Sequence, residues 1–205
     1  MNKNKHDIKI ALVILAAGES TRMGSIKQLL PWKSTTLLGQ AIQQGLSSDA
    51  DSVFVVLGAH YNKIVDTIMD HRITIIENKD WSSGMGSSIA CAMKFIERND
   101  IHFDAVLISL SDQPFIEYKY FNKLINSFLK NNKNIVATQT KSRAGVPSIF
   151  GLDYFKALSE LKNDIGAREI IATNLNDVFI ERTGDLNIDI DTENSYKTLY
   201  NKYGR

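Results

Sequence analysis

Two cations follow a glycine-bearing turn directly after an apolar run near the start of the chain. The run is IKIALVI, and the turn LAAGESTRMGSIKQLLP extends from Leu15 to Pro31. Small residues let a backbone approach a ligand closely, and the exposed N–H groups of such a turn form a concave anion site. Arg22 offers a planar fork of donors and Lys27 a mobile point charge, and both suit phosphate. The pattern favours a phosphate-binding loop over a surface turn with two solvated cations.

Carboxylates that could hold a metal beside such a phosphate occur further along the chain. Asp112 comes directly after the apolar run AVLISL, and Asp189 and Asp191 alternate with isoleucines in NIDID. Mg²⁺ takes one or two carboxylates and completes its shell with water and phosphate oxygens. We expect Asp112 to be the main metal ligand, although an aspartate ahead of Pro114 could also cap a turn. Asp191 is favoured over Asp189 as the second ligand, and either Asp191 or Thr192 could cap the helix that follows.

Two familiar phosphate loops do not match the turn. A P-loop needs glycine followed by Lys and Ser or Thr, and GSIKQ lacks this order. The dinucleotide fingerprint needs three closely spaced glycines and an acidic residue after the next strand. Gly18 and Gly24 are too far apart, and the next apolar run ends in GAHY, without an acid. A nicotinamide-dependent oxidoreductase is therefore disfavoured.

Apolar runs and helical periodicity alternate along the chain, which predicts the elements that carry these residues. We expect strands at 8–15, 52–59, 73–78, 103–111, 134–140, 146–150, 177–182 and 186–191. We expect helices at 35–46, capped by Thr35 or Thr36, and at 61–70, 87–98, 119–131, 153–161, 166–174 and 192–203. This alternation predicts a three-layer α/β/α sandwich with a mostly parallel sheet. Ligands of such sheets bind at the carboxyl ends of the strands, where the loop and Asp112 belong.

Length and composition limit the classes of protein. The 205 residues fit a single domain over 1–205, and the net charge of +1 gives no reason to expect nucleic acid or an anionic membrane as a partner. One cysteine, Cys91, excludes an internal disulfide framework and a multi-cysteine zinc site. The start MNKNKHD does not resemble a signal peptide, and no apolar run approaches the roughly 20 residues of a membrane span, so the cytoplasm is the expected location.

Six segments, in order along the chain, resemble one enzyme family. LAAGESTRMGSIKQLLP resembles the signature of the nucleotidyltransferases of the molybdenum-cofactor group. ENKDWSSGMGSSIACAM, LISLSDQPF, AGVPSIF, LKNDIGAREII and DIDTENSY resemble that group's later motifs. The alanine pair after Leu15 and the DQP turn are similar to the cytidylyltransferase branch, which joins CTP to molybdopterin and releases pyrophosphate. The resemblance implies a Rossmann-like nucleotidyltransferase fold, Mg²⁺ as cofactor, and a molybdoenzyme or its maturation chaperone as a further candidate partner.

The resemblance also implies roles for particular residues. Arg22, Lys27 and Asp112 would be catalytic, and Asp112, Asp191 and Asp189 are the metal-ligand candidates. The nucleotide would be bound by Leu15, Ala16, Ala17, Gly18, Ser20, Arg22, Gly24, Lys27, Asn78, Ser87 and Ser88. Ser87 and Ser88 could cap a helix instead, and Trp81 is more typical of packing than of base stacking. Gly145 and Pro147 would shape the rim at which the second substrate enters, with Arg143 and Arg168 as candidate partners for its phosphate.

Two alternatives to a molybdopterin cytidylyltransferase remain. The enzyme could be a cytidylyl- or other nucleotidyltransferase that acts on a different phosphorylated substrate, such as a sugar phosphate. It could also be a non-catalytic protein that binds and delivers a nucleotide-bearing cofactor. Arg22, Lys27, Asp112 and Asp191 together argue against delivery alone, because binding by itself does not require a pair of metal-holding carboxylates.

Overall fold

The computed structural model describes residues 8–70, 72–140, 143–184, 186 and 188–205. Its strands are β1 (Ile10–Ala16), β2 (Pro31–Trp32), β3 (Thr35–Thr36), β4 (Ser52–Leu57), β5 (Ile73–Glu77), β6 (Ala105–Leu110), β7 (Ile135–Gln139), β8 (Ala144–Gly151) and β9 (Val178–Arg182). Its α-helices are α1 (Leu37–Leu46), α2 (Tyr61–Ile64), α3 (Met85–Arg98), α4 (Tyr118–Lys130), α5 (Phe155–Ser159), α6 (Ala167–Thr173) and α7 (Glu193–Leu199), and α7 continues into a π-helical turn at Tyr200–Gly204. Short 3₁₀ turns lie at Thr21–Met23, Lys27–Leu29, Val65–Thr67, Trp81–Ser83, Leu152–Tyr154 and Leu175–Asp177.

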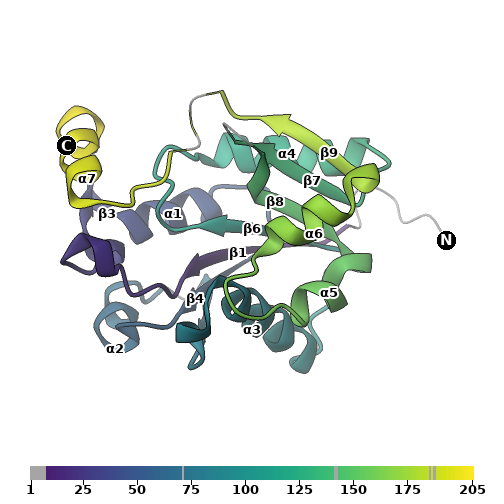
Figure 1. Ribbon diagram of the computed structural model, residues 1–205, viewed down its shortest axis with the longest axis horizontal. Coiled ribbons are helices and arrows are strands. Elements are labelled where there is room, and N and C mark those ends of the chain that lie inside the picture. Colours follow the sequence, from purple (N-terminus) through teal and green to yellow (C-terminus); the bar gives the residue numbers. More distant parts are fainter. Residues whose placement is uncertain (1–7, 71, 141–142, 185, 187) are drawn as a thin grey trace.

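A mostly parallel sheet forms the centre of the molecule (Figure 1). Among the described residues it has seven strands in the order β5-β4-β1-β6-β8-β7-β9. Strands β5, β4, β1 and β6 are parallel, whereas β8 runs antiparallel to both β6 and β7. The switch in strand order beside β1 places the carboxyl ends of β1 and β6 next to each other. Open α/β sheets bind their ligands at this kind of position.

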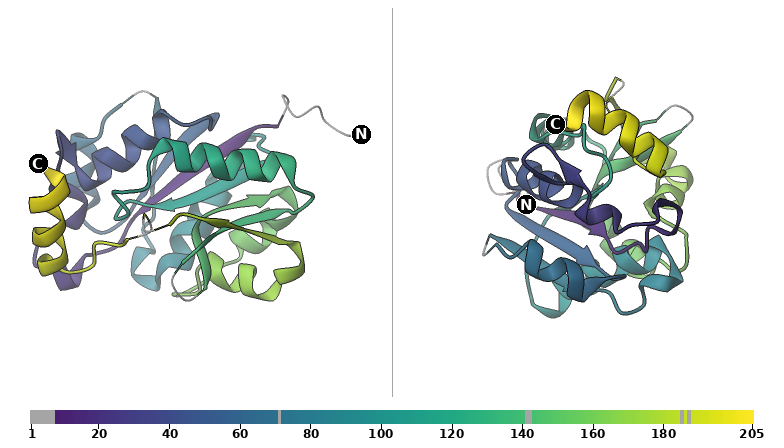
Figure 2. Two further views of the ribbon diagram at one scale, coloured as in Figure 1. Left: turned by 90° about the horizontal axis from the view of Figure 1, so that it is seen from above. Right: turned by 90° about the vertical axis from the view of Figure 1, so that its left-hand side faces the viewer.

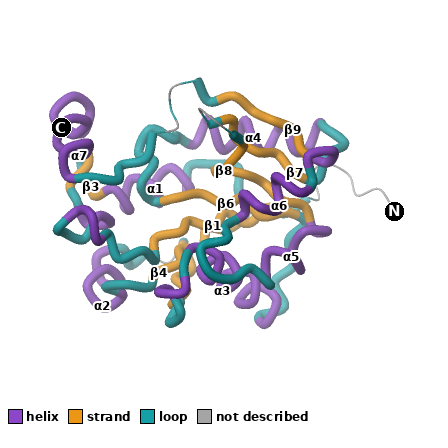
Figure 3. Tube along the Cα trace, viewed as in Figure 1, coloured by secondary structure: helices purple, strands orange, loops and turns teal. Residues whose placement is uncertain are grey.

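Strand β1 shows why the sheet is covered on both faces. Its seven residues are all buried, and alternate side chains enter different cores. Val13 and Leu15 pack with α3, α5 and α6, while Leu12 and Ile14 pack with α1, α2 and α4. Figures 2 and 3 show the helices on the two sides of the strands. The predicted three-layer α/β/α sandwich is therefore confirmed.

Two predicted elements were wrong in extent or type. The helix expected at 61–70 is only the single turn α2 followed by a 3₁₀ turn, because β-branched Val65 and Thr67 disfavour a continued α-helix. The strand expected at 186–191 is absent from the part of it that the structure describes. Its Ile190 N–H donates to the Asp112 carbonyl, at 3.0 Å, and so bonds to the turn after β6 instead of to a neighbouring strand.

The C-terminal helix packs at the end of the molecule toward which β1 and β6 run (Figure 1). Thr192 caps α7 by accepting from the Ser195 N–H, so Asp191 is not needed as the cap. A small apolar cluster, called here the end cluster, lies beneath α7. Its buried members are Met23, Trp32, Leu37 and Ile190, and Phe115, Tyr196, Leu199 and Tyr200 are among the residues that pack against it. None of the helices in the described part of the chain has the length and apolar character needed to cross a membrane.

Candidate active site

A pocket of about 610 Å³ opens at the carboxyl ends of β1 and β6. The turn after β1, the turn after β6, the start of α3 and the segment before α7 contribute to its walls. The side chains and backbone that line it belong to Leu15, Ala16, Ala17, Gly18, Glu19, Ser20, Thr21, Arg22, Met23, Lys27, Gln28, Trp81, Ser82, Gly84, Met85, Ser88, Leu110, Ser111, Asp112, Asp164 and Asp191. Most of the residues predicted to bind nucleotide therefore share one cavity with Asp112 and Asp191, two of the three candidate metal ligands.

The turn after β1 is held in shape by left-handed backbone and by one buried amide. Ser20 has φ 61° and Gly24 has φ 63°, the region that glycine adopts without strain. The Gln28 side-chain amide donates to the carbonyls of Ala16 and Gly18, both at 2.8 Å. Gln28 is only 3% exposed, and sequence reasoning missed it because no motif marks a side chain that bonds to backbone carbonyls. Gln28 thus fixes the part of the loop that faces the pocket.

Lys27 lies between the two candidate metal ligands. Its Nζ is 2.7 Å from Asp112 Oδ2 and 3.5 Å from Asp191 Oδ1. Arg22 Nη2 is 4.0 Å from the same Asp191 oxygen, and the Arg22 side chain is 74% exposed. The lysine is held and largely buried, whereas the arginine is free to swing toward a ligand. The loop and the carboxylates, more than 80 residues apart in sequence, therefore form one charged constellation.

The Asp112 carboxylate has one oxygen to spare. Oδ2 accepts from Lys27, but Oδ1 is buried and has no hydrogen-bond partner among the described residues. Burial raises the pKa of the Asp112 carboxyl, the Lys27 charge and hydrogen bond lower it, and Asp189 and Asp191 raise it further. A buried carboxylate oxygen without a donor is costly, and a bound cation would satisfy it.

A divalent metal fits this donor set if a nucleotide supplies the remaining ligands. Asp112 and Asp191 would provide two carboxylates, which is the number that Mg²⁺ commonly takes from protein. Within the described ranges no group of three or more His, Cys, Asp or Glu side chains is placed to hold a metal ion. Metal and triphosphate would therefore be bound together, each completing the site of the other.

Asp189 is directed elsewhere. Its Oδ1 accepts from the Gln113 side-chain amide at 2.9 Å, and Asp189 does not line the pocket. Asp191 lines the pocket and faces Lys27. The geometry therefore supports the preference for Asp191 as the second candidate ligand.

Asn78 separates this pocket from a second one. Its amide donates to Ser87 Oγ at 2.9 Å and Ser88 Oγ at 3.0 Å, and its own oxygen accepts from the Asp80 N–H. Ser88 lines the pocket at β1, but Asn78 and Ser87 line a neighbouring groove. Asn78 is 3% exposed and fully occupied by these bonds, so it positions Ser88 and does not itself line the pocket at β1.

Other residues singled out from sequence lie around the pocket or away from it. Gly24 does not line the pocket, although its left-handed backbone shapes the loop. Trp81 packs against Gly58, where an added Cβ would meet the Trp81 side chain, and it also lines the pocket. Arg168 lies beside Gly145, outside the lining of the cavity. Asp164 was not predicted as a site residue, yet it lines the cavity.

The sheet, its switch in strand order, and the cation-bearing loop opposite a carboxylate turn define an α/β enzyme of the nucleotidyltransferase class. The solved structures agree: the Rv0371c homolog from mycobacterium sp. strain JC1 superposes with a TM-score of 0.80 at 27% identity, covering 94% of this chain and 96% of that one. Rv0371C complexed with manganese, from Mycobacterium tuberculosis H37Rv, superposes with a TM-score of 0.78 at 23% identity, covering 93% and 97%. The predicted nucleotidyltransferase fold is confirmed.

The family follows from the sequence match. The model of the MobA-like NTP transferase domain matches residues 12–178, and the chain belongs to that family. Nicotine blue oxidoreductase of Paenarthrobacter nicotinovorans is 30% identical over 200 residues, covering 91% of this chain and 95% of that protein. Molybdenum cofactor cytidylyltransferase of Escherichia coli (strain K12) is 28% identical over 116 residues, covering 56% and 57%. The resemblance noted from the motifs is thus confirmed at the level of the family.

Proposed function

We propose that the protein transfers CMP from CTP to molybdopterin and releases pyrophosphate, with Mg²⁺ as cofactor and in the cytoplasm. One observation carries the nucleotidyl transfer: Lys27 bridges Asp112 and Asp191 inside the cavity formed by the loop after β1. Support for cytidine and molybdopterin comes from the alanine pair at Ala16 and Ala17 and from the similarity to the Escherichia coli cytidylyltransferase.

The reaction forms one P–O bond and breaks another. An oxygen of the acceptor's phosphate attacks the α-phosphorus of CTP, and the bond to the β-phosphate breaks as pyrophosphate leaves with its electron pair. Lys27 and Arg22 neutralise the charge that builds on the leaving group, and the loop N–H groups hold the triphosphate in line. A divalent metal would supply further positive charge to the phosphates. Asp112 and Asp191 would hold it, and Gln28 keeps the loop in shape for the nucleotide.

Ligand binding would rearrange the ion pairs seen in the free pocket. Lys27 is 15% exposed and Asp112 18% exposed, so both are close to the pocket surface. Transfer of the lysine from Asp112 Oδ2 to a phosphate would free that oxygen for the metal. In the free pocket the Lys27–Asp112 ion pair therefore keeps both groups at the pocket, and a triphosphate with its metal would replace that pair.

A nucleotide panel tests the proposal directly. The protein is incubated with molybdopterin, MgCl₂ and each of CTP, GTP, ATP and UTP, and pyrophosphate is measured. Among the four nucleotides, we expect pyrophosphate release only with CTP. We expect no release when molybdopterin is omitted. An Asp112→Asn variant, which keeps the shape of the side chain, should bind the nucleotide but release no pyrophosphate. Release that is equal with all four nucleotides, or unchanged in the variant, would contradict the assignment.

A different phosphorylated acceptor remains within the same chemistry. The assignment of Arg168 to the acceptor's phosphate rests on motif resemblance, because Arg168 lies outside the lining of the cavity. Repeating the panel with sugar 1-phosphates in place of molybdopterin separates the two acceptors. Pyrophosphate release with a sugar phosphate only would keep the nucleotidyl transfer and replace the acceptor.

A second candidate function comes from the oxidoreductase relative. The 30% identity with nicotine blue oxidoreductase extends over most of both chains. A relative that is named for redox chemistry is therefore similar to this protein over almost its whole length. Addition of NADH or NADPH with a quinonoid dye acceptor, read at 340 nm as roughly one nicotinamide oxidised per two electrons, tests this candidate. Nicotinamide oxidation without pyrophosphate release would favour it. A delivery protein would show neither, and would retain the nucleotide-bearing cofactor instead.

A further inference from the structure

A second groove lies on the other side of the Asn78 wall, between strand β5 and helix α3. Its volume is about 690 Å³, and none of the nucleotide-pocket lining takes part in it. One wall is the strand segment Ile75, Ile76 and Glu77, and the opposite wall is a face of α3. The groove is therefore separate from the pocket of the proposed reaction. The outcome of a binding test at the groove would neither support nor contradict that reaction.

Strand β5 ends the sheet, and its outer edge has no partner strand among the described residues. The Asn78 N–H donates to the Leu57 carbonyl of β4, so Asn78 points inward. In a parallel strand the N–H and C=O of one residue point to the same side, and successive residues alternate. Ile75 and Glu77 therefore direct their backbone donors and acceptors outward. Cys91 Sγ lies 3.7 Å from the outward Glu77 carbonyl, a long and weak contact.

The helix beside this edge presents cations. Ser87, Cys91, Lys94 and Arg98 are spaced by four, three and four residues, which places them along one face of α3. Lys162, from the segment before α6, lies on the same groove. Lys94, Arg98 and Lys162, called here the basic flank, form no ion pair or side-chain hydrogen bond with any residue that the structure describes.

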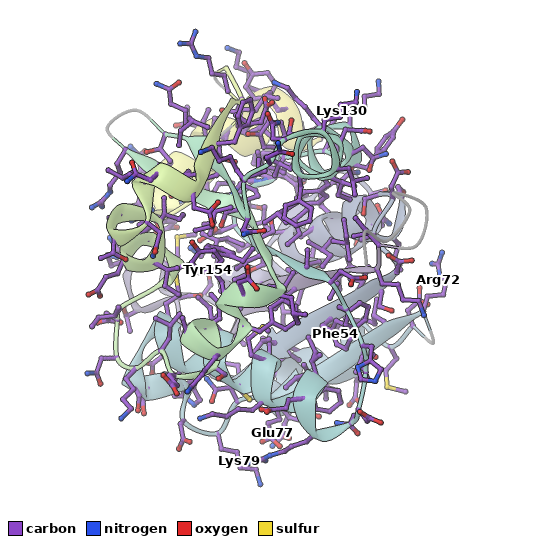
Figure 4. The ribbon with its side chains drawn as sticks, turned by 90° about the vertical axis from the view of Figure 1, so that its right-hand side faces the viewer. Phe54, Arg72, Glu77, Lys79, Lys130 and Tyr154 are labelled. Carbon is purple, nitrogen blue, oxygen red and sulfur yellow. The ribbon has the colours of Figure 1, made fainter. Side chains whose placement is uncertain are left out.

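The acidic residues of the groove lie near its other end. Glu77 is the last residue of β5, and its carbonyl accepts from Cys91 Sγ, which lies about one turn before Lys94 on the helix. Asp80 lies beyond Glu77 and is close enough to raise the pKa of the Cys91 thiol, which burial raises more. A ligand would therefore meet cations along the C-terminal half of α3 and would not be repelled there. Figure 4 shows Glu77 and Lys79 at this rim of the molecule.

We propose that the outer edge of β5, with the basic flank beside it, receives an extended, carboxylate-rich segment of a partner protein as an added strand. Unpaired edge groups are a template for strand addition, in which backbone bonds give affinity and alternate side chains give specificity. Every second side chain of the incoming strand would face α3, where a carboxylate meets Lys94 or Arg98. A small anion would use the cations but would leave the outward backbone groups of Ile75 and the outward Glu77 N–H without a partner.

The test uses two labelled peptides and the intact protein. One peptide alternates glutamate and valine, and the matched peptide alternates lysine and valine; binding is measured by fluorescence anisotropy and mapped by amide chemical shifts. We expect only the glutamate peptide to bind, with shifts at Ile75 and Glu77. The double variant Lys94→Glu with Arg98→Glu should weaken binding by about tenfold or more, since two attractive contacts become repulsive. Pyrophosphate release by the double variant should be unchanged.

Ile75→Pro isolates the backbone contribution. Proline removes an outward N–H that makes no bond in the sheet, and edge strands tolerate this. The variant should keep its circular dichroism spectrum and lose peptide binding. Lys130→Glu on α4 is the matched charge control, because Lys130 lies at the opposite end of the molecule from Glu77 in Figure 4. If Ile75→Pro does not fold, the double charge reversal decides alone.

Three outcomes would overturn the proposal. Equal binding of the lysine peptide would show that the basic flank does not select the ligand. Displacement of the glutamate peptide by inorganic pyrophosphate, with shifts at the same amides, would identify a small-anion site instead of a strand acceptor. Shifts confined to the loop after β1 would show that the peptide had entered the nucleotide pocket.

Discussion

Replacement of Ile190 by alanine should reduce catalysis indirectly, because Ile190 does not line the pocket but holds residues that do. Ile190 is fully buried in the end cluster with Met23, and its N–H holds the Asp112 carbonyl at 3.0 Å. Its chain neighbour Asp191 faces Lys27, and Met23 directly follows Arg22. One isoleucine therefore fixes the spacing between the cation loop and the carboxylates.

The size of the effect can be worked from burial. An Ile→Ala change in a packed core costs about 2–5 kcal/mol. For a chain of this length each kcal/mol lowers the Tm by about 2–4 °C, so we expect a decrease of about 4–20 °C. A displacement of about 1 Å at a reacting group costs about 10²-fold in rate. We therefore expect kcat/KM for the nucleotide to decrease by about 10- to 100-fold, and the metal concentration for half-maximal activity to increase.

The assay is pyrophosphate release at a temperature well below the lowered Tm, so that unfolding does not contribute. Ile188→Ala is the matched control, because Ile188 lies two residues away in the same segment and is 37% exposed. Ile190→Val, which costs about 0.5–1.5 kcal/mol, should restore most of the activity. An Ile190→Ala protein with a lowered Tm but an unchanged kcat/KM would refute the reasoning, since the cluster would then only stabilise the fold.

Three further predictions concern the loop, the glycines and a surface carboxylate. Lys27→Ala should raise the KM for the nucleotide and reduce kcat/KM by about 10²–10³-fold in the pyrophosphate assay, because it removes a preorganised cation; an unchanged kcat/KM would place Lys27 outside the mechanism. Gly86→Ala should lower the Tm by about 2–12 °C, because the added Cβ meets three backbone carbonyl oxygens and overpacking costs about 1–3 kcal/mol. Gly18→Ala is the contrast: an added Cβ there has no atom within 4 Å, so this variant should keep the Tm and raise the KM for the nucleotide. Although burial raises the pKa of Asp177, hydrogen bonds from a backbone N–H and from the Tyr154 hydroxyl lower it overall, so its stabilisation is present above the unfolded pKa of about 3.9 and is lost as the pH falls through the lower folded pKa. Asp177→Asn should thus lower the Tm at pH 7, with a difference that shrinks in acid when Tm is measured against pH.

The sequence predicted the parts of the fold that depend on local pattern. The unbroken apolar run of β1 indicated a strand buried on both faces, and both faces are indeed covered. Thr36, proposed as a cap, accepts from the Gly39 N–H at the start of α1. The rule that parallel strands direct their carboxyl ends to one edge was enough to place Lys27 near Asp112, a pair separated by more than 80 residues.

The individual side-chain contacts that orient the site left no signal in the sequence. The sequence favoured Asp191 over Asp189 without the contacts that distinguish them: the Gln113 amide donates to Asp189, whereas Lys27 faces Asp191. The segment containing Ile190 has the alternation of a strand, but its N–H bonds to a turn at the end of the sheet. Neither contact leaves a periodic signal, because each depends on how separate elements meet in space.

The order in which the chain is synthesised has a consequence for the proposed chemistry. The loop after β1 emerges from the ribosome early and Asp112 near the middle, but Asp191 and the helix that closes the end cluster are among the last described residues. A nascent chain that has reached only β9 already contains the loop after β1 but lacks Asp191 and the apolar cluster that supports it. Incomplete chains would therefore be unable to consume nucleotide, and activity would begin only after translation has passed α7.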